Sequence, residues 1–216
     1  MSTSEELRGL RVSYELGVLD ESSVAPDPFD QFRVWLEAAL ADERIVEPNA
    51  MTLATLGLDG RPSARTVLLR DCDRRGLTFF TNYESRKGRE LQAKPFATLL
   101  FWWGSLQRQV RIDGTVERVD AADSDAYFAE RPRGHQLGAW ASQQSAPVPS
   151  RPYLEARVKE EEQRFAGRDV ERPSYWGGFR VVPDAFEFWQ GRQDRVHDRI
   201  SYAREERGWQ ITRLSP

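Results

Sequence analysis

The chain has 216 residues, of which 39% are hydrophobic and 30% are charged, so it is expected to fold around a core rather than remain disordered. Its net charge of −3 gives no electrostatic ground for binding nucleic acid, and no apolar run approaches the roughly 20 residues of a membrane span. The single cysteine, Cys72, excludes an internal disulfide and a cysteine-based metal site, so a cytoplasmic enzyme or binding protein with no metal is expected.

The first 26 residues are polar around one apolar patch, and they are expected to form an N-terminal arm that precedes a domain over 27–216. Asp27 followed by Pro28 is typical of a helix start, with the aspartate as N-cap and the proline in the first turn. Apolar residues then recur at helical spacing to about Glu43, which predicts one amphipathic helix.

A β-hairpin is predicted next, because strands over 51–57 and 62–70 flank the turn pair Asp59-Gly60. A third strand is expected over 77–82. Ser85 is the expected N-cap of a short helix that ends before Pro95.

The remainder of the chain is predicted to be rich in strands. Strands are expected over 96–103, 107–119, 178–182, 185–190, 195–202 and 209–214, and helices over 121–130, 136–142 and 153–166. The strands come in hairpin-connected runs without alternating helices, which argues against a parallel sheet. The predicted fold class is therefore mainly β (α+β), an antiparallel barrel with peripheral helices.

The segment 81–87 places a strand end next to a cationic helix start. Arg86 and Lys87 follow the Ser85 cap in the first helical turn. Cations at that position oppose the helix dipole, which favours anions near the N-terminus. A bound phosphate would reconcile the two by using free backbone N–H groups and both cations. An ordinary serine cap with solvated cations is the alternative.

Other segments carry groups suited to anions. Arg65 and Arg70 stand at the two ends of an apolar strand, which also fits a strand with solvated ends. Tyr127 and Arg131 are four residues apart, so on one helix face they are able to grip an anion together. The polar run 143–145 follows an apolar turn and is either ligand-binding or ordinary loop.

Arg195, His197 and Arg199 are predicted to share one face of a strand, because side chains alternate along it. Three such groups repel one another unless an anion or a flat π-system lies against them. The sequence thus indicates two anion-binding groups and a cationic face, with no nucleophile triad, metal cluster or glycine-rich phosphate loop. This pattern favours two phosphorylated ligands bound side by side.

These segments, in this order, resemble the pyridoxamine 5′-phosphate oxidase family. The matching pieces lie between about residue 8 and the last residue of the sequence, at 10–14, 65–70, 80–87, 108–110, 127–145, 176–180 and 188–199. The most specific is Glu-Phe-Trp-Gln-Gly followed by Arg-x-His-Asp-Arg, which ends at Arg199. The resemblance implies an FMN-binding split barrel with Greek-key connections, working as a homodimer with each flavin at the subunit interface.

The resemblance also implies roles for individual residues. FMN would be bound by Arg65, Thr66, Val67, Leu68, Leu69, Arg70, Phe80, Thr81, Arg86, Lys87, Gln109, Gln144, Ser145, Trp189 and Arg199. The substrate's 5′-phosphate would be bound by Arg70, Tyr127, Arg131 and His135. Arg195 and His197 would be the catalytic residues beside the pyridine ring, and Arg11 and Tyr14 would close over it as a lid.

The activity implied is oxidation of pyridoxamine or pyridoxine 5′-phosphate to pyridoxal 5′-phosphate, a step of vitamin B6 cofactor synthesis. Hydride would pass from the substrate's C4′ to flavin N5, and O₂ would reoxidise the flavin and give hydrogen peroxide; the protein contributes orientation and electrostatics. Two positions depart from the usual family pattern: Arg70 stands where lysine is usual, and His135 where serine is usual. Phosphate recognition survives both changes, whereas the choice between the two substrates is left open.

Three rival functions are weighed against this one. A sister oxidase of the same fold that acts on phenazine precursors would not need the phosphate-binding set of Tyr127, Arg131 and Arg70. A non-catalytic flavin-binding protein would not need Arg195 and His197. A nucleic-acid binder would suit the abundance of arginine, since only three of the 31 cationic side chains are lysines, but it fits neither the net charge nor the order of the motifs.

Overall fold

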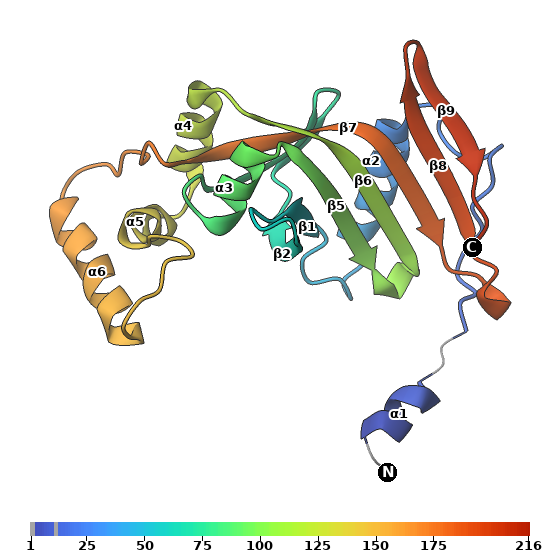
Figure 1. Cartoon of the computed structure of the whole chain (residues 1–216), viewed down its shortest axis with the longest axis horizontal. Coiled ribbons are helices and arrows are strands. Elements are labelled where there is room, and N and C mark those ends of the chain that lie inside the picture. The colour runs from blue at the N-terminus through green and yellow to red at the C-terminus, as the bar shows by residue number, and fades with distance from the viewer. Residues whose placement is uncertain (1–2, 11–12) are drawn as a thin grey trace. The chain divides into compact units, whose positions relative to one another are not determined.

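A computed structural model of the chain describes residues 3–10 and 13–216. In chain order its elements are α1 (Thr3–Gly9), α2 (Pro28–Leu40), β1 (Ala50–Leu56), β2 (Pro62–Leu68), β3 (Asp71–Asp73), β4 (Gly76–Asn82), α3 (Arg86–Ala93), β5 (Phe96–Trp103), η1 (Gly104–Leu106), β6 (Arg108–Arg118), α4 (Ala121–Glu130), α5 (Arg133–Ala141), α6 (Arg151–Arg164), β7 (Trp176–Gln190), η2 (Gln193–Arg195), β8 (Asp198–Glu205) and β9 (Gly208–Arg213) (Figure 1).

The chain forms two compact units whose segments alternate along the sequence. The first unit consists of residues 1–49, 100–112 and 184–216, and the second of residues 50–99 and 113–183. Strands β5, β6 and β7 each contribute residues to both units. Each unit is therefore built from segments that are distant in sequence.

A single strand order, β2-β1-β5-β6-β7-β4-β3, runs through the sheet, with β8 paired to β7 and β9 paired to β8. The pairs β1–β2, β3–β4, β4–β7, β7–β8 and β8–β9 are antiparallel. The β1–β2 hairpin turns through Gly60, whose φ of 80° suits glycine. The prediction of an antiparallel sheet with added helices is confirmed.

Helix starts follow the predicted capping residues. The Asp27 side chain accepts a hydrogen bond from the Phe29 N–H at 2.8 Å, and α2 begins at Pro28 but ends at Leu40, earlier than predicted. The Ser85 hydroxyl accepts from the Gly88 N–H at 3.2 Å at the start of α3. Both caps satisfy amide groups that a helix start leaves unpaired.

The core of the first unit is largely aromatic. Phe32 of α2 is fully buried with its ring 5.2 Å from that of Phe101, and Trp35 lies 5.3 Å from Phe188. Burial of one such side chain contributes about 1.5–3 kcal/mol. In the second unit, Phe128, Leu137, Phe165, Val170 and Trp176 form a buried cluster.

Strand β7 corrects the prediction of separate strands over 178–182 and 185–190. It is continuous through Pro183. Its ladder with β4 ends at Val181, and its ladder with β8 begins at Ala185. Proline is tolerated at this position because it lies between these two ladders. The short strand β3 was not predicted.

Strand β8 begins at Asp198, so the predicted strand over 195–202 is wrong at its start. Asp194 and Arg195 have positive φ values of 53° and 61° and belong to the short helix η2. Such left-handed residues interrupt an extended strand. Arg195, His197 and Arg199 are therefore not placed on one face by strand alternation.

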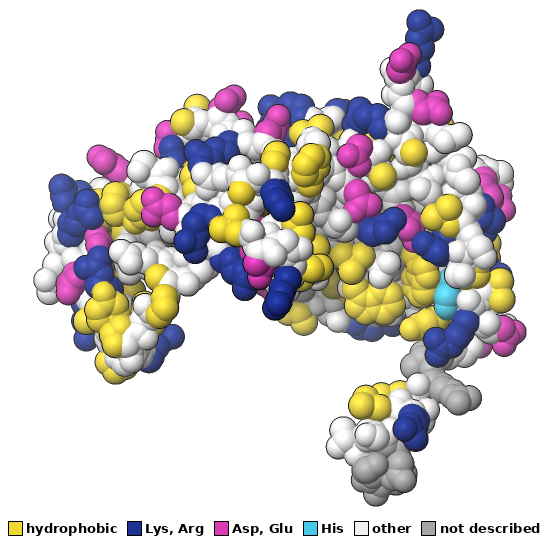
Figure 2. All heavy atoms as spheres, in the orientation of Figure 1, with side chains coloured by type: hydrophobic (Ala, Val, Ile, Leu, Met, Phe, Trp, Pro, Cys, Tyr) yellow, Lys and Arg dark blue, Asp and Glu magenta, His cyan; other side chains and the backbone are white. Residues whose placement is uncertain are grey.

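The distribution of surface charge relates to nucleic-acid binding, and the length and hydropathy of the helices relate to a membrane span. On the face drawn in Figure 2, Lys and Arg side chains are interspersed with Asp and Glu and do not gather into a single basic tract. In the described part of the chain, no helix is long and apolar enough to cross a membrane.

Candidate active site

A cavity of about 590 Å³ lies in the second unit, within the size range of small-molecule sites. It is lined by Thr66, Val67, Leu68, Arg70, Phe80, Thr81, Lys87, Tyr127, Glu130, Arg131, Pro132, His135, Gln144 and Trp176. The structure thus brings together most of the residues of this unit that were predicted to contact FMN or the substrate's phosphate. Leu69, also predicted, is buried and is not part of the lining.

Arg131 lies over an aromatic wall of this cavity. The rings of Phe80, Tyr127 and Trp176 are nearly parallel, with centroids 4.0 Å apart for Phe80–Tyr127 and 5.5 Å apart for Phe80–Trp176. The Arg131 guanidinium lies 4.6 Å from the centre of the Trp176 ring. Arg131 directly follows Glu130, the last residue of α4, and is not itself helical. It nevertheless lines the same cavity as Tyr127 of that helix.

One nitrogen of Arg131 has no hydrogen-bond partner among the residues that the structure describes. Its NH1 atom is buried and makes no hydrogen bond within the described chain. Burial also lowers the pKa of the Arg131 guanidinium. A buried donor without a partner costs about 1–3 kcal/mol, and more when it is charged, so such a group is a strong sign of a ligand acceptor.

The start of α3 gathers the second group of predicted residues. The Lys87 ammonium donates to Thr81 Oγ1 at 3.3 Å and to Gln144 Oε1 at 3.1 Å. The Ser145 hydroxyl accepts from the Arg86 N–H at 3.1 Å. Burial, followed by the nearby charge of Arg65, lowers the pKa of the Lys87 ammonium. Both causes disfavour the charged ammonium, and a bound anion would favour it.

Glu90 is a buried acid of α3 that the sequence analysis missed. Its side chain is 1% exposed and forms ion pairs with Arg65 at 2.7 Å and Arg86 at 2.9 Å. Burial alone would raise the pKa of the Glu90 carboxyl, but hydrogen bonds from Thr55, Arg86 and Arg65 lower it to about 2. Arg65 and Arg86, both predicted to bind phosphate, lie against Glu90 and are not among the residues that line the cavity.

The first unit carries the remaining predicted residues around the turn before β8. Arg195 is exposed in η2, whereas the His197 ring is half-buried. The His197 ring centroid lies 4.6 Å from that of Trp189 and 5.8 Å from that of Tyr14. The structure therefore groups three predicted residues, Tyr14, Trp189 and His197.

His197 is oriented by the backbone of its own turn. Its Nδ1 atom accepts a hydrogen bond from the Arg192 N–H at 3.1 Å, which leaves Nε2 as the protonated nitrogen of the neutral ring. Burial, followed by the charge of Arg195, lowers the pKa of His197 below its ordinary value of 6.5. The ring is thus neutral at pH 7 and presents a single N–H donor.

Arg199 of β8 is fixed by a second buried acid. Its Nε donates to Glu187 at 2.8 Å, and its NH1 donates to the Ser215 carbonyl at 2.7 Å. Gln109 lies on β6, half-buried. Arg11 lies outside the described residues.

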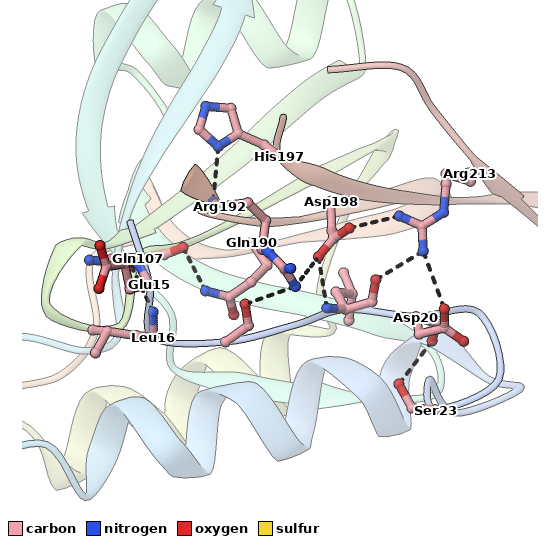
Figure 3. A network of polar contacts seen from close by, with 12 residues as sticks. Glu15, Leu16, Asp20, Ser23, Gln107, Gln190, Arg192, His197, Asp198 and Arg213 are labelled. Carbon is pink, nitrogen blue, oxygen red and sulfur yellow. Dashed lines mark hydrogen bonds and ion pairs between the residues drawn. The ribbon is translucent and has the colours of Figure 1, made fainter. Parts of the chain in front are cut away.

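Side chains from later segments of the first unit hold the described part of the arm, among them Gln107, Asp198 and Arg213, which Figure 3 shows. Gln107 Oε1 accepts from the Glu15 and Leu16 N–H groups at 2.9 and 3.2 Å. Asp198 accepts from the Leu19 N–H at 3.1 Å, and Arg213 donates to the Leu19 carbonyl at 3.1 Å. Neither Gln107 nor Arg213 was singled out from the sequence, because a lone glutamine or arginine gives no such signal.

Two family models cover most of the chain. Residues 37–165 match the model described as pyridoxamine 5′-phosphate oxidase, and residues 176–216 match that of the pyridoxine 5′-phosphate oxidase C-terminal dimerisation region. The chain belongs to the pyridoxamine 5′-phosphate oxidase family. Among the described residues, no group of three or more His, Cys, Asp or Glu side chains is arranged to hold a metal ion.

Relatives within this oxidase family are similar over their whole length. A pyridoxine/pyridoxamine 5′-phosphate oxidase of Burkholderia multivorans is 57% identical over 213 residues, covering 97% of this chain and 99% of the relative. One of the same description from Rubrobacter xylanophilus is 57% identical over 211 residues, covering 98% and 97%.

Solved structures confirm the split-barrel fold of this oxidase family. PhzG from Burkholderia lata, solved in complex with tetrahydrophenazine-1-carboxylic acid, aligns with a TM-score of 0.87 at 31% identity and covers 95% of this chain and 100% of PhzG. A pyridoxamine 5′-phosphate oxidase-related, FMN binding protein from Nostoc punctiforme aligns with a TM-score of 0.70 at 20% identity, covering 90% and 100%, and is similar in fold alone.

Proposed function

We propose that this chain is an FMN-dependent oxidase that converts pyridoxamine 5′-phosphate and pyridoxine 5′-phosphate to pyridoxal 5′-phosphate. The observation that carries the proposal is the buried NH1 of Arg131, which has no hydrogen-bond partner among the described residues and lies in a cavity that Arg70 and Tyr127 also line. A phosphate monoester supplies the several acceptor oxygens that such a cationic set requires. The relatives at 57% identity support the same substrate class.

The residues present also fit FMN. Lys87, Thr81 and Gln144 meet beside the start of α3, where the lysine ammonium and the positive end of the helix dipole favour a phosphate. Phe80 and the strand residues 66–68 supply the apolar lining that a flavin ring needs. When bound, FMN would accept the hydride from the substrate and pass its electrons to O₂, with hydrogen peroxide as product.

The chain's own residues would orient the substrate rather than transfer its protons. Arg70, Tyr127 and Arg131 would hold the 5′-phosphate, with His135 donating a further hydrogen bond. Arg195 would contact the pyridine ring. The neutral His197, held through Nδ1, would donate from Nε2 near the reacting carbon. Positioning of this kind lowers the barrier to a transfer step without an obligatory base. A homodimer would complete the site, in line with the dimerisation region matched by residues 176–216.

The decisive experiment is to purify the full chain, record its visible spectrum and assay peroxide. Substrates are pyridoxamine 5′-phosphate, pyridoxine 5′-phosphate, the unphosphorylated vitamers and a tetrahydrophenazine carboxylic acid. We expect a yellow protein that forms peroxide with the two phosphate esters. Activity on the phenazine precursor alone would favour the sister-oxidase function, which the likeness to PhzG makes the relevant rival. Colourless protein that fails to bind added FMN would overturn the proposal.

A further inference from the structure

The proposed phosphate site contains a buried acid with no role in binding an anion directly. Glu90 sits in α3, which packs on β1, and its two oxygens divide their contacts. Oε1 accepts from Arg86 Nε at 2.9 Å, while Oε2 accepts from Arg65 NH2 at 2.7 Å and from the Thr55 hydroxyl at 2.6 Å. A single carboxylate thereby joins a strand arginine to a helix arginine.

The same network fixes Arg65 from three further directions. Its NH1 donates to Thr55 Oγ1 at 2.6 Å and to the Leu53 carbonyl at 3.2 Å, and its NH2 donates to Ser63 Oγ at 2.5 Å. An arginine held in this way keeps a single rotamer, so little side-chain entropy remains to be lost when an anion arrives. After burial, the positive charge of Arg65 is the next cause of the lowered pKa of Lys87, so the two cations repel each other.

The charges of the cluster match a phosphate monoester. Arg65, Arg86 and Lys87 carry three positive charges, and Glu90 carries one negative charge, which leaves two. A phosphate monoester near pH 7 carries about −1.5 to −2. Without the acid, three cations would crowd one site in the absence of ligand, and their mutual repulsion would disfavour the folded arrangement.

We propose that Glu90 is a positioning residue that holds Arg65 and Arg86 as one unit beside Lys87, so that the cluster receives the phosphate of the flavin cofactor. This role rests on the proposed function, because it presupposes that FMN is the ligand. Glu90 does not touch the ligand, and its effect is confined to the phosphate end. Riboflavin lacks only the phosphate of FMN. A comparison of the Kd values for the two flavins therefore distinguishes this role from a general role in folding.

The test compares FMN and riboflavin binding to flavin-free full-length protein, followed by quenching of flavin fluorescence. The variants are Glu90→Gln, which keeps the size and removes the charge, and Thr55→Val, which removes one hydroxyl of the network. Glu161→Gln is the matched control, because Glu161 is a buried acid of α6 paired with Arg157 and Arg164. Thermal unfolding of each flavin-free variant shows whether it folds.

We expect Glu90→Gln to raise the Kd for FMN about tenfold and Thr55→Val about threefold, as loss of charge-assisted hydrogen bonds does. In both variants the Kd for riboflavin should stay within about twofold of the wild-type value. In Glu161→Gln the Kd values for FMN and riboflavin should both stay within the same limit. If Glu90→Gln does not fold, the FMN-to-riboflavin ratio of Thr55→Val decides.

The role of Glu90 would be overturned by equal loss of FMN and riboflavin affinity, and also by tighter FMN binding by Glu90→Gln. The first would make Glu90 a folding residue, and the second would make it a competitor of phosphate for the arginines. Wild-type protein that binds neither flavin would overturn the proposed function, and the role of Glu90 with it. Wild-type binding with an unchanged ratio in both variants would overturn the role alone.

Discussion

Lys87 is the cation of α3 that lines the cavity directly, with hydrogen bonds to Thr81 and Gln144. We expect Lys87→Ala to weaken FMN binding about tenfold or more, because a hydrogen bond to a charged group contributes about 1.5–3 kcal/mol. Lys94→Ala, an exposed cation at the end of the same helix, is the control. The measurement is the flavin content after purification, followed by titration with FMN. Wild-type flavin retention by Lys87→Ala would place the phosphate elsewhere.

Arg195 and Arg199 differ in their surroundings, and so should their variants. Arg195 is exposed and available to a substrate, whereas Arg199 is bound to Glu187 and Ser215. We expect Arg195→Leu to keep fold and flavin but to lower kcat/KM about 30- to 1,000-fold, because it removes a charged contact to the substrate. His197→Asn should be milder, and Arg199→Leu should reduce flavin content first.

Steady-state kinetics at matched flavin occupancy check this series. Arg207→Leu, an exposed position in the turn between β8 and β9, serves as the control and should behave as wild type. Near-normal kcat/KM for Arg195→Leu would remove Arg195 from the substrate site.

Single residues with a cationic or capping pattern were predictable, and buried acids were not. Ser85 was predictable because its hydroxyl caps a helix start. Lys87 was predictable because a cation in the first helical turn opposes the helix dipole. Glu90 lies four residues after Arg86 in a polar helix, where an acid is normally a solvated partner. Its burial arises from the packing of α3 on β1, which no local pattern encodes. Glu187 was hidden in a strand motif for the same reason.

The contact of α3 with the β1–β2 hairpin should depend on pH through Glu90. Its pKa in the folded chain, about 2, lies below its ordinary value of 4.5. A lowered folded-state pKa gives stability that is complete above pH 4.5 and is lost as the pH falls towards about 2. The full difference is on the order of 3 kcal/mol. Urea unfolding at several pH values should show a difference between wild type and Glu90→Gln that shrinks below pH 4.5. A difference independent of pH would contradict this assignment.

Elements that begin or end at a capping residue or a turn pair were predicted well. The caps Asp27 and Ser85, and the Asp59-Gly60 turn, act on neighbouring backbone groups, so local sequence suffices. The continuity of β7 through Pro183 depends instead on which strands pair on either side. The turn before β8 requires two residues with positive φ that are neither glycine nor asparagine, and nothing in the sequence marks them.

The arm is expected to depend on Arg213 for its attachment. Arg213 pairs with Asp198 at 2.8 Å (Figure 3). It also pairs with Glu21 at 2.6 Å and donates to the Leu19 carbonyl. We expect Arg213→Leu to raise the hydrogen-exchange rate of the Leu19 amide about tenfold, because loss of these contacts favours local opening. Arg33→Leu is the control, because Arg33 forms an exposed ion pair with Asp30 within α2. Unchanged protection of Leu19 would show that Gln107 and Asp198 suffice. Closure of the arm as a lid stays a prediction.

At the scale of the whole chain, the division into an arm over 1–26 and one domain over 27–216 stays a prediction, and the contacts group the chain into two interleaved compact units. Composition gives no boundary between these units because β5, β6 and β7 each contribute residues to both. The antiparallel class was predictable from hairpin order. The unit to which each segment belongs was not predictable, because it depends on pairings between strands far apart in sequence.

The protein is expected to be a homodimer in solution. Residues 176–216 match a dimerisation region, and Trp102 of β5 is 51% exposed beside Trp189, 5.9 Å away. Large exposed aromatic side chains of this kind are typical of protein interfaces. We expect sedimentation to give twice the 24.9 kDa mass of the chain. Trp102→Glu should shift the protein towards monomer and release flavin together with the partner, because a charge in the core of an interface of about 1,200–2,000 Å² is poorly tolerated. Val46→Glu, at a 93% exposed loop position, should leave the dimer intact. A flavin-loaded wild-type monomer with full activity would contradict the dimer, and it would show that a single chain supplies every residue of the site.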